Sequence, residues 1–156
     1  PTFINISKFA IHVMLIAIVI IIFMAFGYMP DVYLLQLPIY MILAFLFLNF
    51  WGLFSSLLGV ISKDYTNLVK SFITALFWLS GIMWNPETIH NETIRRVLNL
   101  NPVTFLVNGF RNCFINKIWI WQQPKRLIYF ILLTIVLLAL AVATYKKLRK
   151  DIPDVL

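Results

Sequence analysis

The side chains that could carry acid–base or metal chemistry are few and scattered along this sequence. His12 and His90 have no cysteine or carboxylate neighbours at the spacing of metal ligands. A membrane enzyme of lipid-linked sugars would need acids clustered at the interface. We therefore expect no metal site and no catalysis. The acids, which we interpret as solvated charges, are Asp31, Asp64, Glu87, Glu92, Asp151 and Asp154.

The sequence also lacks a phosphate-binding loop. No segment matches G-x-x-x-x-G-K-[ST], the pattern whose backbone N–H groups cradle nucleotide phosphates. We therefore expect that the chain itself binds no ATP and no other cofactor. Its one cysteine, Cys113, permits no internal disulfide.

One segment carries polar residues at helical spacing among apolar neighbours. Four of them follow one another at intervals of four, three and one, and so share one face of a helix. The arginine among them is costly, because a charge at the bilayer centre costs about 2.5 to 3.5 kcal/mol. Two interpretations stay open: a helix lying flat in the membrane interface, or a helix that dips into the bilayer beside a watery path. The stripe is Thr104, Asn108, Arg111 and Asn112.

A second stripe consists mainly of small residues, at intervals of three, four and three. Small residues let another helix approach closely, and an amide among them can hydrogen-bond across the contact. Tight helix packing is the simpler interpretation, and a wall facing a transported molecule is the other. The stripe is Asn49, Gly52, Ser56 and Gly59.

The composition indicates the class of fold that holds these two stripes. Hydrophobic residues make up 62% of the chain and charged residues 12%, against about a quarter charged in a soluble domain. A chain of 156 residues has too little interior to hide so much apolar surface. Lipid must cover the remainder, so we predict an all-α membrane protein.

Four apolar runs are long enough to cross a hydrocarbon core of about 30 Å at about 1.5 Å per residue. The third is the weakest, because Lys70 shortens its uncharged part and must snorkel to the interface. Residues 62–67 read as a short polar connection before it. The predicted transmembrane helices are 9–29, 37–61, 68–84 and 127–145.

Between the third and fourth spans lies a segment, 85–125, that is neither a plain loop nor plainly transmembrane. Asn85 before Pro86, and Asn101 before Pro102, each supply an N-cap and a first helical residue. We therefore predict two short re-entrant or interfacial helices, near 86–98 and 102–116.

The net charge of +7 could suggest nucleic acid, but the basic residues lie almost entirely outside the apolar runs. They read as topology signals facing head groups, or as partners of an anionic cargo. The basic residues on the two sides of the membrane nearly balance, and the compact basic tail at 146–150 favours cytoplasmic ends. We expect no nucleic-acid partner.

Three stretches together resemble one protein family. They are WLSGI at 78–82 ahead of a proline, NP at 101–102 with VNGFRN at 107–112, and the ending YKKLRKDIPDVL at 145–156. The chain resembles the permease subunit of ABC-2 type exporters of cell-surface polymers, and it is most similar to the teichoic acid translocation permeases of Gram-positive bacteria. The resemblance covers residues 1–156 but corresponds to the C-terminal part of the family's transmembrane domain. A whole member would have two more helices and a cytoplasmic amphipathic segment before Pro1.

The resemblance implies a membrane-spanning subunit of an ATP-driven exporter that moves a lipid-linked polymer across the plasma membrane. Teichoic acid is the first candidate for this polymer. It implies a partner ATPase that holds ATP and Mg, a second copy of the permease, and contact with membrane lipids. Both ends would be cytoplasmic, and 85–125 would be the external re-entrant region. The polar stripe at Thr104 to Asn112 would then be an external gate or cargo path. The candidate cytoplasmic coupling residues are Lys8, Lys63, Asp64 and Tyr65.

Other functions remain open at this point. A capsular polysaccharide or O-antigen exporter would share the same features. A membrane enzyme of lipid-linked glycan synthesis would show metal-dependent turnover by the chain alone. The third alternative is a passive channel or a scaffold subunit, which conductance without nucleotide would support. Co-purification with an ATPase would favour the exporter.

Overall fold

The computed structural model describes residues 2–151, and these residues form helices and no strands, which confirms the all-α prediction. The longer helices are α1 (Thr2–Ala25), α2 (Leu37–Ile61), α3 (Lys63–Leu79) and α6 (Pro124–Asp151). Two shorter ones, α4 (Glu92–Asn99) and α5 (Pro102–Arg111), lie between α3 and α6. Single turns of 3-10 helix are η1 (Val32–Gln36), η2 (Pro86–Thr88) and η4 (Ile120–Gln122), and η3 (Asn112–Asn116) is a π-helical turn.

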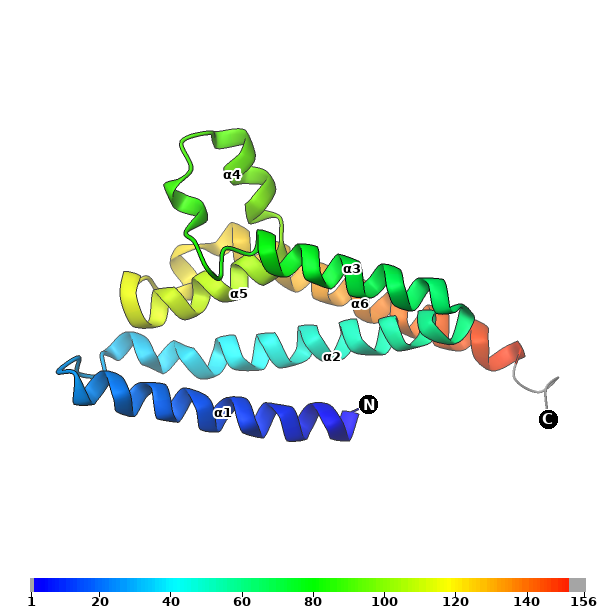
Figure 1. Cartoon of the computed structure of the whole chain (residues 1–156), viewed down its shortest axis with the longest axis horizontal. Coiled ribbons are helices and arrows are strands. Elements are labelled where there is room, and N and C mark those ends of the chain that lie inside the picture. The colour runs from blue at the N-terminus through cyan, green and yellow to red at the C-terminus, as the bar shows by residue number, and fades with distance from the viewer. Residues whose placement is uncertain (1, 152–156) are drawn as a thin grey trace.

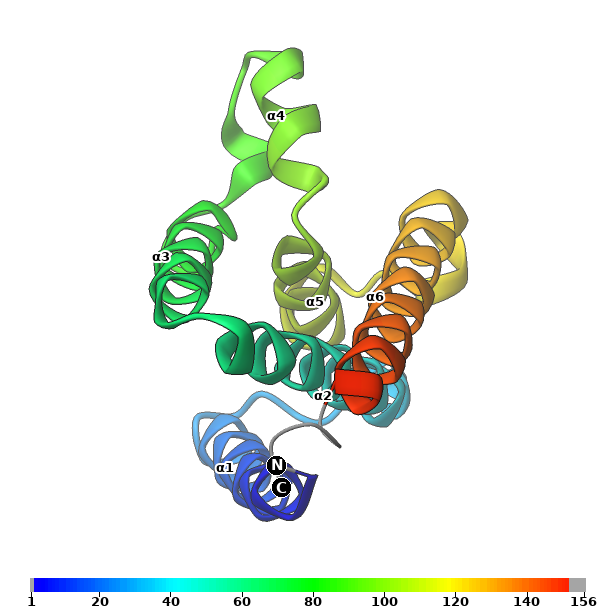
Figure 2. The ribbon, with the colours of Figure 1, turned by 90° about the vertical axis from the view of Figure 1, so that its right-hand side faces the viewer.

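Helix α2 is the centre of the arrangement. It contacts α1 on one side and α3, α5 and α6 on the other, as the end-on view shows (Figure 2). The start of α1, the α2–α3 connection and the end of α6 lie at one end of the bundle (Figure 1). The α1–α2 loop and the turns that follow α5 lie at the opposite end.

Three helical segments are long and apolar enough to span a membrane: Ile6–Ala25, Val32–Ile61 and Pro124–Leu148. They correspond to the first, second and fourth predicted spans, and they make this a multi-pass membrane protein. The third predicted span is not among them. Helix α3 has only 17 residues and carries Asp64 in its first turn.

Helix α3 covers residues 63–79, whereas the predicted third span is 68–84, and the predicted polar connection 62–67 is helical from Lys63 onward. Only Ser62 separates α2 from α3. Its hydroxyl accepts a hydrogen bond from the Asp64 N–H at 3.2 Å, so the polar residues read as a loop form the capped first turn of a helix. The helix ends at Leu79 because Gly81 adopts a left-handed conformation with φ of 73°.

Three other predicted boundaries can be compared. The first helix ends at Ala25, before Met29, since Gly27 terminates it with φ of 86°. The predicted helix 86–98 is two pieces, η2 and α4, because Asn91 caps a new helix by accepting from two backbone N–H groups. The predicted helix 102–116 is confirmed as α5 continued by η3.

The core lies where α5 and α6 pack against α2. The rings of Phe105 and Phe130 stack at 4.8 Å between centroids, and the Tyr40 ring lies 5.9 Å from Phe105. Gly109 faces Tyr40 so closely that a Cβ atom at this position would overlap the ring. Tyr40 is 2% exposed and cannot move aside. The absence of a side chain at Gly109 therefore sets the distance between α5 and α2.

We predict that Gly109→Ala destabilises the protein although alanine is the better helix former. Overpacking of this kind costs about 1–3 kcal/mol, more than the gain in helix propensity of about 1 kcal/mol. The thermal unfolding midpoint of the detergent-solubilised protein should fall. Tyr40→Leu should restore part of the loss in the double variant. Additive losses in the double variant would contradict the proposed contact.

Candidate functional site

The C-terminal end of α3 is held by side chains rather than by further helix. A helix end leaves backbone carbonyl groups without helical partners, and in lipid these groups cannot turn to water. Asn101 donates to the Leu76 carbonyl at 2.9 Å, and Ser80 donates to the Phe77 carbonyl at 2.6 Å. Each of these carbonyls therefore has a donor inside the protein.

Arg111 completes this arrangement from α5. Its Nη2 donates to the carbonyl oxygens of Gly81 at 2.6 Å, Trp84 at 3.1 Å and Ile82 at 3.3 Å. The second terminal nitrogen, Nη1, is buried and has no partner among the described residues. Gly81 is confined as well, because a Cβ atom there would overlap Pro86. The turn after α3 is therefore fixed to α5 by a single guanidinium.

Two of the sequence stretches that suggested a family therefore meet in space. Residues 78–82 form the end of α3 and its turn. Arg111 donates to Gly81 within this stretch, and Asn101 donates to Leu76 just before it. The third stretch, 145–156, continues α6 to Asp151, and residues 152–156 lie outside the described residues.

Asn108 in α5 and Asn112 in η3 make none of the hydrogen bonds to the α3 turn that Arg111 makes. Both are buried, and the π-helical turn brings Asn116 onto the same face. Asn116 donates to the Asn112 side-chain oxygen at 3.0 Å. Thr104, one turn earlier, is 1% exposed, and its hydroxyl has no partner among the described residues. The predicted polar stripe therefore divides into an amide face and an arginine that holds a turn.

The amide face borders a cavity of about 270 Å³ between α5, η2 and the start of α6. We call it the amide pocket. An ion pair between Glu87 and Arg126, 2.9 Å long and partly exposed, crosses from η2 to α6 beside it. The pocket is lined by Asn85, Glu87, Asn108, Asn112, Asn116, Ile118, Gln123 and Arg126.

Sequence reasoning found two of these lining residues, Asn108 and Asn112. Asn116 continues the spacing of four and could have been included. Glu87, Gln123 and Arg126 carry no such signal, since they come from other elements and only the fold brings them to the pocket.

A buried glutamine holds the wall that follows η3. Gln36 is 1% exposed, its Nε2 donates to the Ile118 carbonyl at 2.8 Å, and its Oε1 accepts from the Ile120 N–H at 2.9 Å. The side-chain amide satisfies two backbone groups of a non-helical segment at once. The start of α2 thereby fixes Ile118 beside the amide pocket.

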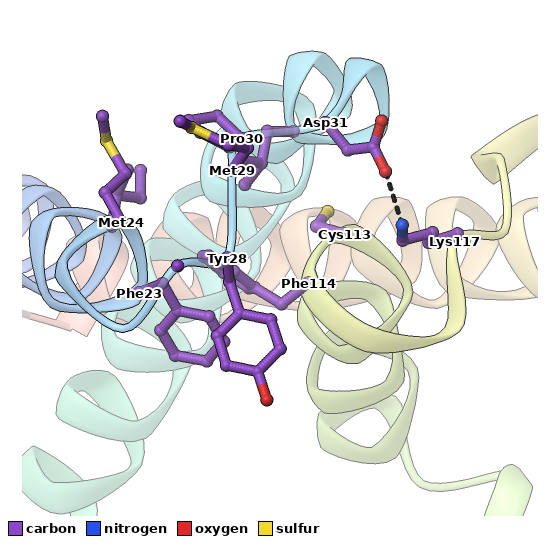
Figure 3. Close-up of a pocket in the computed structure, with 12 residues that line it drawn as sticks. Phe23, Met24, Tyr28, Met29, Pro30, Asp31, Cys113, Phe114 and Lys117 are labelled. Carbon is purple, nitrogen blue, oxygen red and sulfur yellow. Dashed lines mark ion pairs between the residues drawn. The ribbon is translucent and has the colours of Figure 1, made fainter.

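A second cavity, of about 360 Å³, lies between the α1–α2 loop and η3 (Figure 3). Asp31 and Lys117 form an ion pair of 2.6 Å at its edge, and three aromatic rings line another side. The hydrogen bond and charge of Lys117 lower the pKa of Asp31, and those of Asp31 raise the pKa of Lys117. Because the pair is exposed, it contributes little to stability. The rings belong to Phe23, Tyr28 and Phe114.

The remaining predicted residues lie elsewhere. In the packing stripe, Asn49 is buried and donates to the Phe45 carbonyl of its own helix, whereas Ser56 is exposed. A Cβ atom on Gly59 would lie 3.0 Å from the Thr66 hydroxyl, so that end of the stripe approaches α3. Gly52 is half-buried. The coupling candidates Lys8, Lys63, Asp64 and Tyr65 are exposed. They belong to the first part of α1 and the start of α3, and the starts of these two helices lie toward the same end of the bundle (Figure 1).

The apolar helices and the side-chain-capped turn between them define a multi-pass α-helical membrane protein. The family model of the ABC-2 type transporter matches residues 1–115. The chain therefore belongs to the ABC-2 type transporter family. A comparison with curated proteins gave no match. Membership makes the chain a membrane component for transport, and the family implies an ATPase partner.

We predict that Arg111→Met, which keeps the apolar stem and removes the donors, loosens the turn after α3. Each carbonyl left without a partner costs about 1–3 kcal/mol. Hydrogen–deuterium exchange should rise in the peptide covering 80–89. Arg96→Met is the control, because Arg96 is exposed and pairs only with Glu92 on its own helix. Equal exchange in the two variants would contradict the role of Arg111.

Proposed function

We propose that the chain is the permease subunit of an ATP-driven exporter that moves a lipid-linked cell-surface polymer across the plasma membrane. The observation that carries the proposal is its membership of the ABC-2 type transporter family. Teichoic acid is the first candidate cargo, through the resemblance of the segments around Gly81, Asn101 and Arg111 to teichoic acid permeases. ATP and Mg would be bound by the partner ATPase, and a second permease copy would complete the membrane channel.

The proposed machine needs contact with the ATPase at one end of the bundle and passage of cargo at the other. The start of α1 and the α2–α3 connection lie toward one end, which supports coupling residues there (Figure 1). The amide pocket is built from the predicted external region. Its polar lining supports contact with a polar cargo, since hydroxyl and phosphate groups need hydrogen-bonding partners.

A capsular polysaccharide or O-antigen is the second candidate cargo. The observation that favours it is the charge balance of the amide pocket, where the one cationic lining residue, Arg126, is paired with Glu87. A polyanionic teichoic acid would be better served by unpaired cations. Analysis of the composition of the exported polymer, phosphate-containing or neutral, decides between the two.

We expect 62–66 to face the cytoplasm and 85–125 to face outside. Single cysteines at Asp64 and Glu92, placed in a background without Cys113, test this, because both native side chains are exposed. An impermeant thiol reagent added to intact cells should label position 92 and spare position 64. The reverse pattern would overturn the proposed orientation.

We further expect Asn108→Ala and Arg111→Lys to lower surface polymer while the ATPase stays bound. One lost hydrogen bond of about 0.5–1.5 kcal/mol corresponds to about a two- to tenfold effect. All three carbonyl contacts of Arg111 are made by its terminal Nη2, and the shorter lysine side chain does not reach that position. Surface polymer is measured at matched membrane abundance, with Asn67→Ala as the control at the opposite end. Export at the wild-type level in Asn108→Ala would exclude the pocket from the cargo path.

A further inference from the structure

Asn108 is the residue of the amide pocket that is hardest to explain by folding alone. It is 7% exposed, it lines the pocket, and its side-chain amide makes no hydrogen bond to any described residue. Because Asn108 lines the cavity, the donors and the acceptor of its amide are open to a molecule that enters the pocket. The side-chain amide of Asn108 can therefore form hydrogen bonds with a ligand in the cavity.

The groups around Asn108 define the chemistry of that ligand. Asn112, Asn116 and Gln123 add further side-chain amides, each with donors and an acceptor. A hydroxyl group is also both donor and acceptor, so it matches an amide in either orientation. A phosphate offers acceptors alone and calls for unpaired positive charge.

The two charged residues that line the pocket have opposite charges and form an ion pair with each other. Arg126 and Glu87 pair at 2.9 Å, so the pocket offers no free cation among its lining residues. The paired groups can still donate to and accept from neighbouring hydroxyls. A cavity of about 270 Å³ is near the lower end of small-molecule sites, which begin at about 300 Å³. A single ring-sized unit is therefore the appropriate scale.

We propose that the amide pocket binds one uncharged, hydroxyl-rich glycosyl unit of the exported polymer. This deepens the proposed function and rests on it for the identity of the cargo. Asn108 is the central recognition residue, and the other amides and the Glu87–Arg126 pair contact the remaining hydroxyls.

The test is ligand-observed saturation-transfer NMR on the full chain in nanodiscs of phospholipid alone. The probes are glucose, N-acetylglucosamine and, as the anionic comparator, glycerol 3-phosphate. We expect saturation transfer to a neutral sugar, reduced about two- to tenfold in Asn108→Leu, as for one lost hydrogen bond. The matched control Asn67→Leu replaces an exposed asparagine of α3 and should bind as the wild type does. If Asn108→Leu does not fold, Gln123→Leu on the other wall replaces it.

Three results would overturn the proposal: no transfer to either sugar, sugar binding that is equal in the pocket variant and the control, or stronger Asn108-dependent transfer to glycerol 3-phosphate. A further control adds either a neutral glycolipid or a soluble polymer fragment to the nanodiscs. If the glycolipid displaces the sugar and the polymer fragment does not, the pocket binds the sugar of a membrane lipid. This result would overturn the claim that the bound glycosyl unit belongs to the exported polymer. Because the assay needs neither ATP nor export, its readout does not depend on transport. Sugar binding without export in cells would refute the exporter and the cargo identity that rests on it, and would leave the sugar site. Export without sugar binding would refute this inference alone.

Discussion

The structure depends on how the backbone is satisfied where α3 stops. A chain that leaves a helix among apolar surroundings exposes carbonyl groups that lipid cannot hydrogen-bond. Here Asn101 and Arg111 supply the donors, and both residues belong to the next long-range element, α5, and its cap. The requirement for donors therefore fixes α5 beside α3, while Gly109 allows it to approach α2 closely. The position of α5 follows from these two constraints together.

The amide pocket is a consequence of that position. With Arg111 turned toward the end of α3, the face of α5 that carries Asn108 is directed toward α6 and η2. Gln36 fixes the segment after η3 by satisfying two backbone groups, and the Glu87–Arg126 pair joins the remaining walls. Arg111, which serves folding, and Asn108, whose amide has no partner among residues 2–151, thus lie on one short helix. The Asn108 amide is therefore open to a ligand from the pocket.

Much of the helical pattern could be predicted because it is local. The uncharged run 37–61 and the caps at Asn85 and Asn101 specify their own elements, and the bounds of α2 agree with the prediction. The beginning of α3 was misjudged because Ser62 and the polar residues after it suit both a loop and a capped first helical turn. The amide pocket could be predicted only in part. Its Asn108 and Asn112 share a helical periodicity, whereas Glu87, Gln123 and Arg126 are brought there by tertiary packing that no spacing reveals.

The central claim is that the amide face of α5 and η3 meets the transported polymer. Site-specific photocrosslinking tests it most directly, with a benzophenone amino acid at position 116 or at position 115, in cells with an active ATPase partner. Asn116 lines the pocket, and its neighbour Ile115 is 67% exposed and does not. The account predicts capture of polymer at position 116, little at position 115, and loss of the crosslink when the ATPase is inactivated. Equal capture at both positions, or none at position 116 during active export, would contradict it.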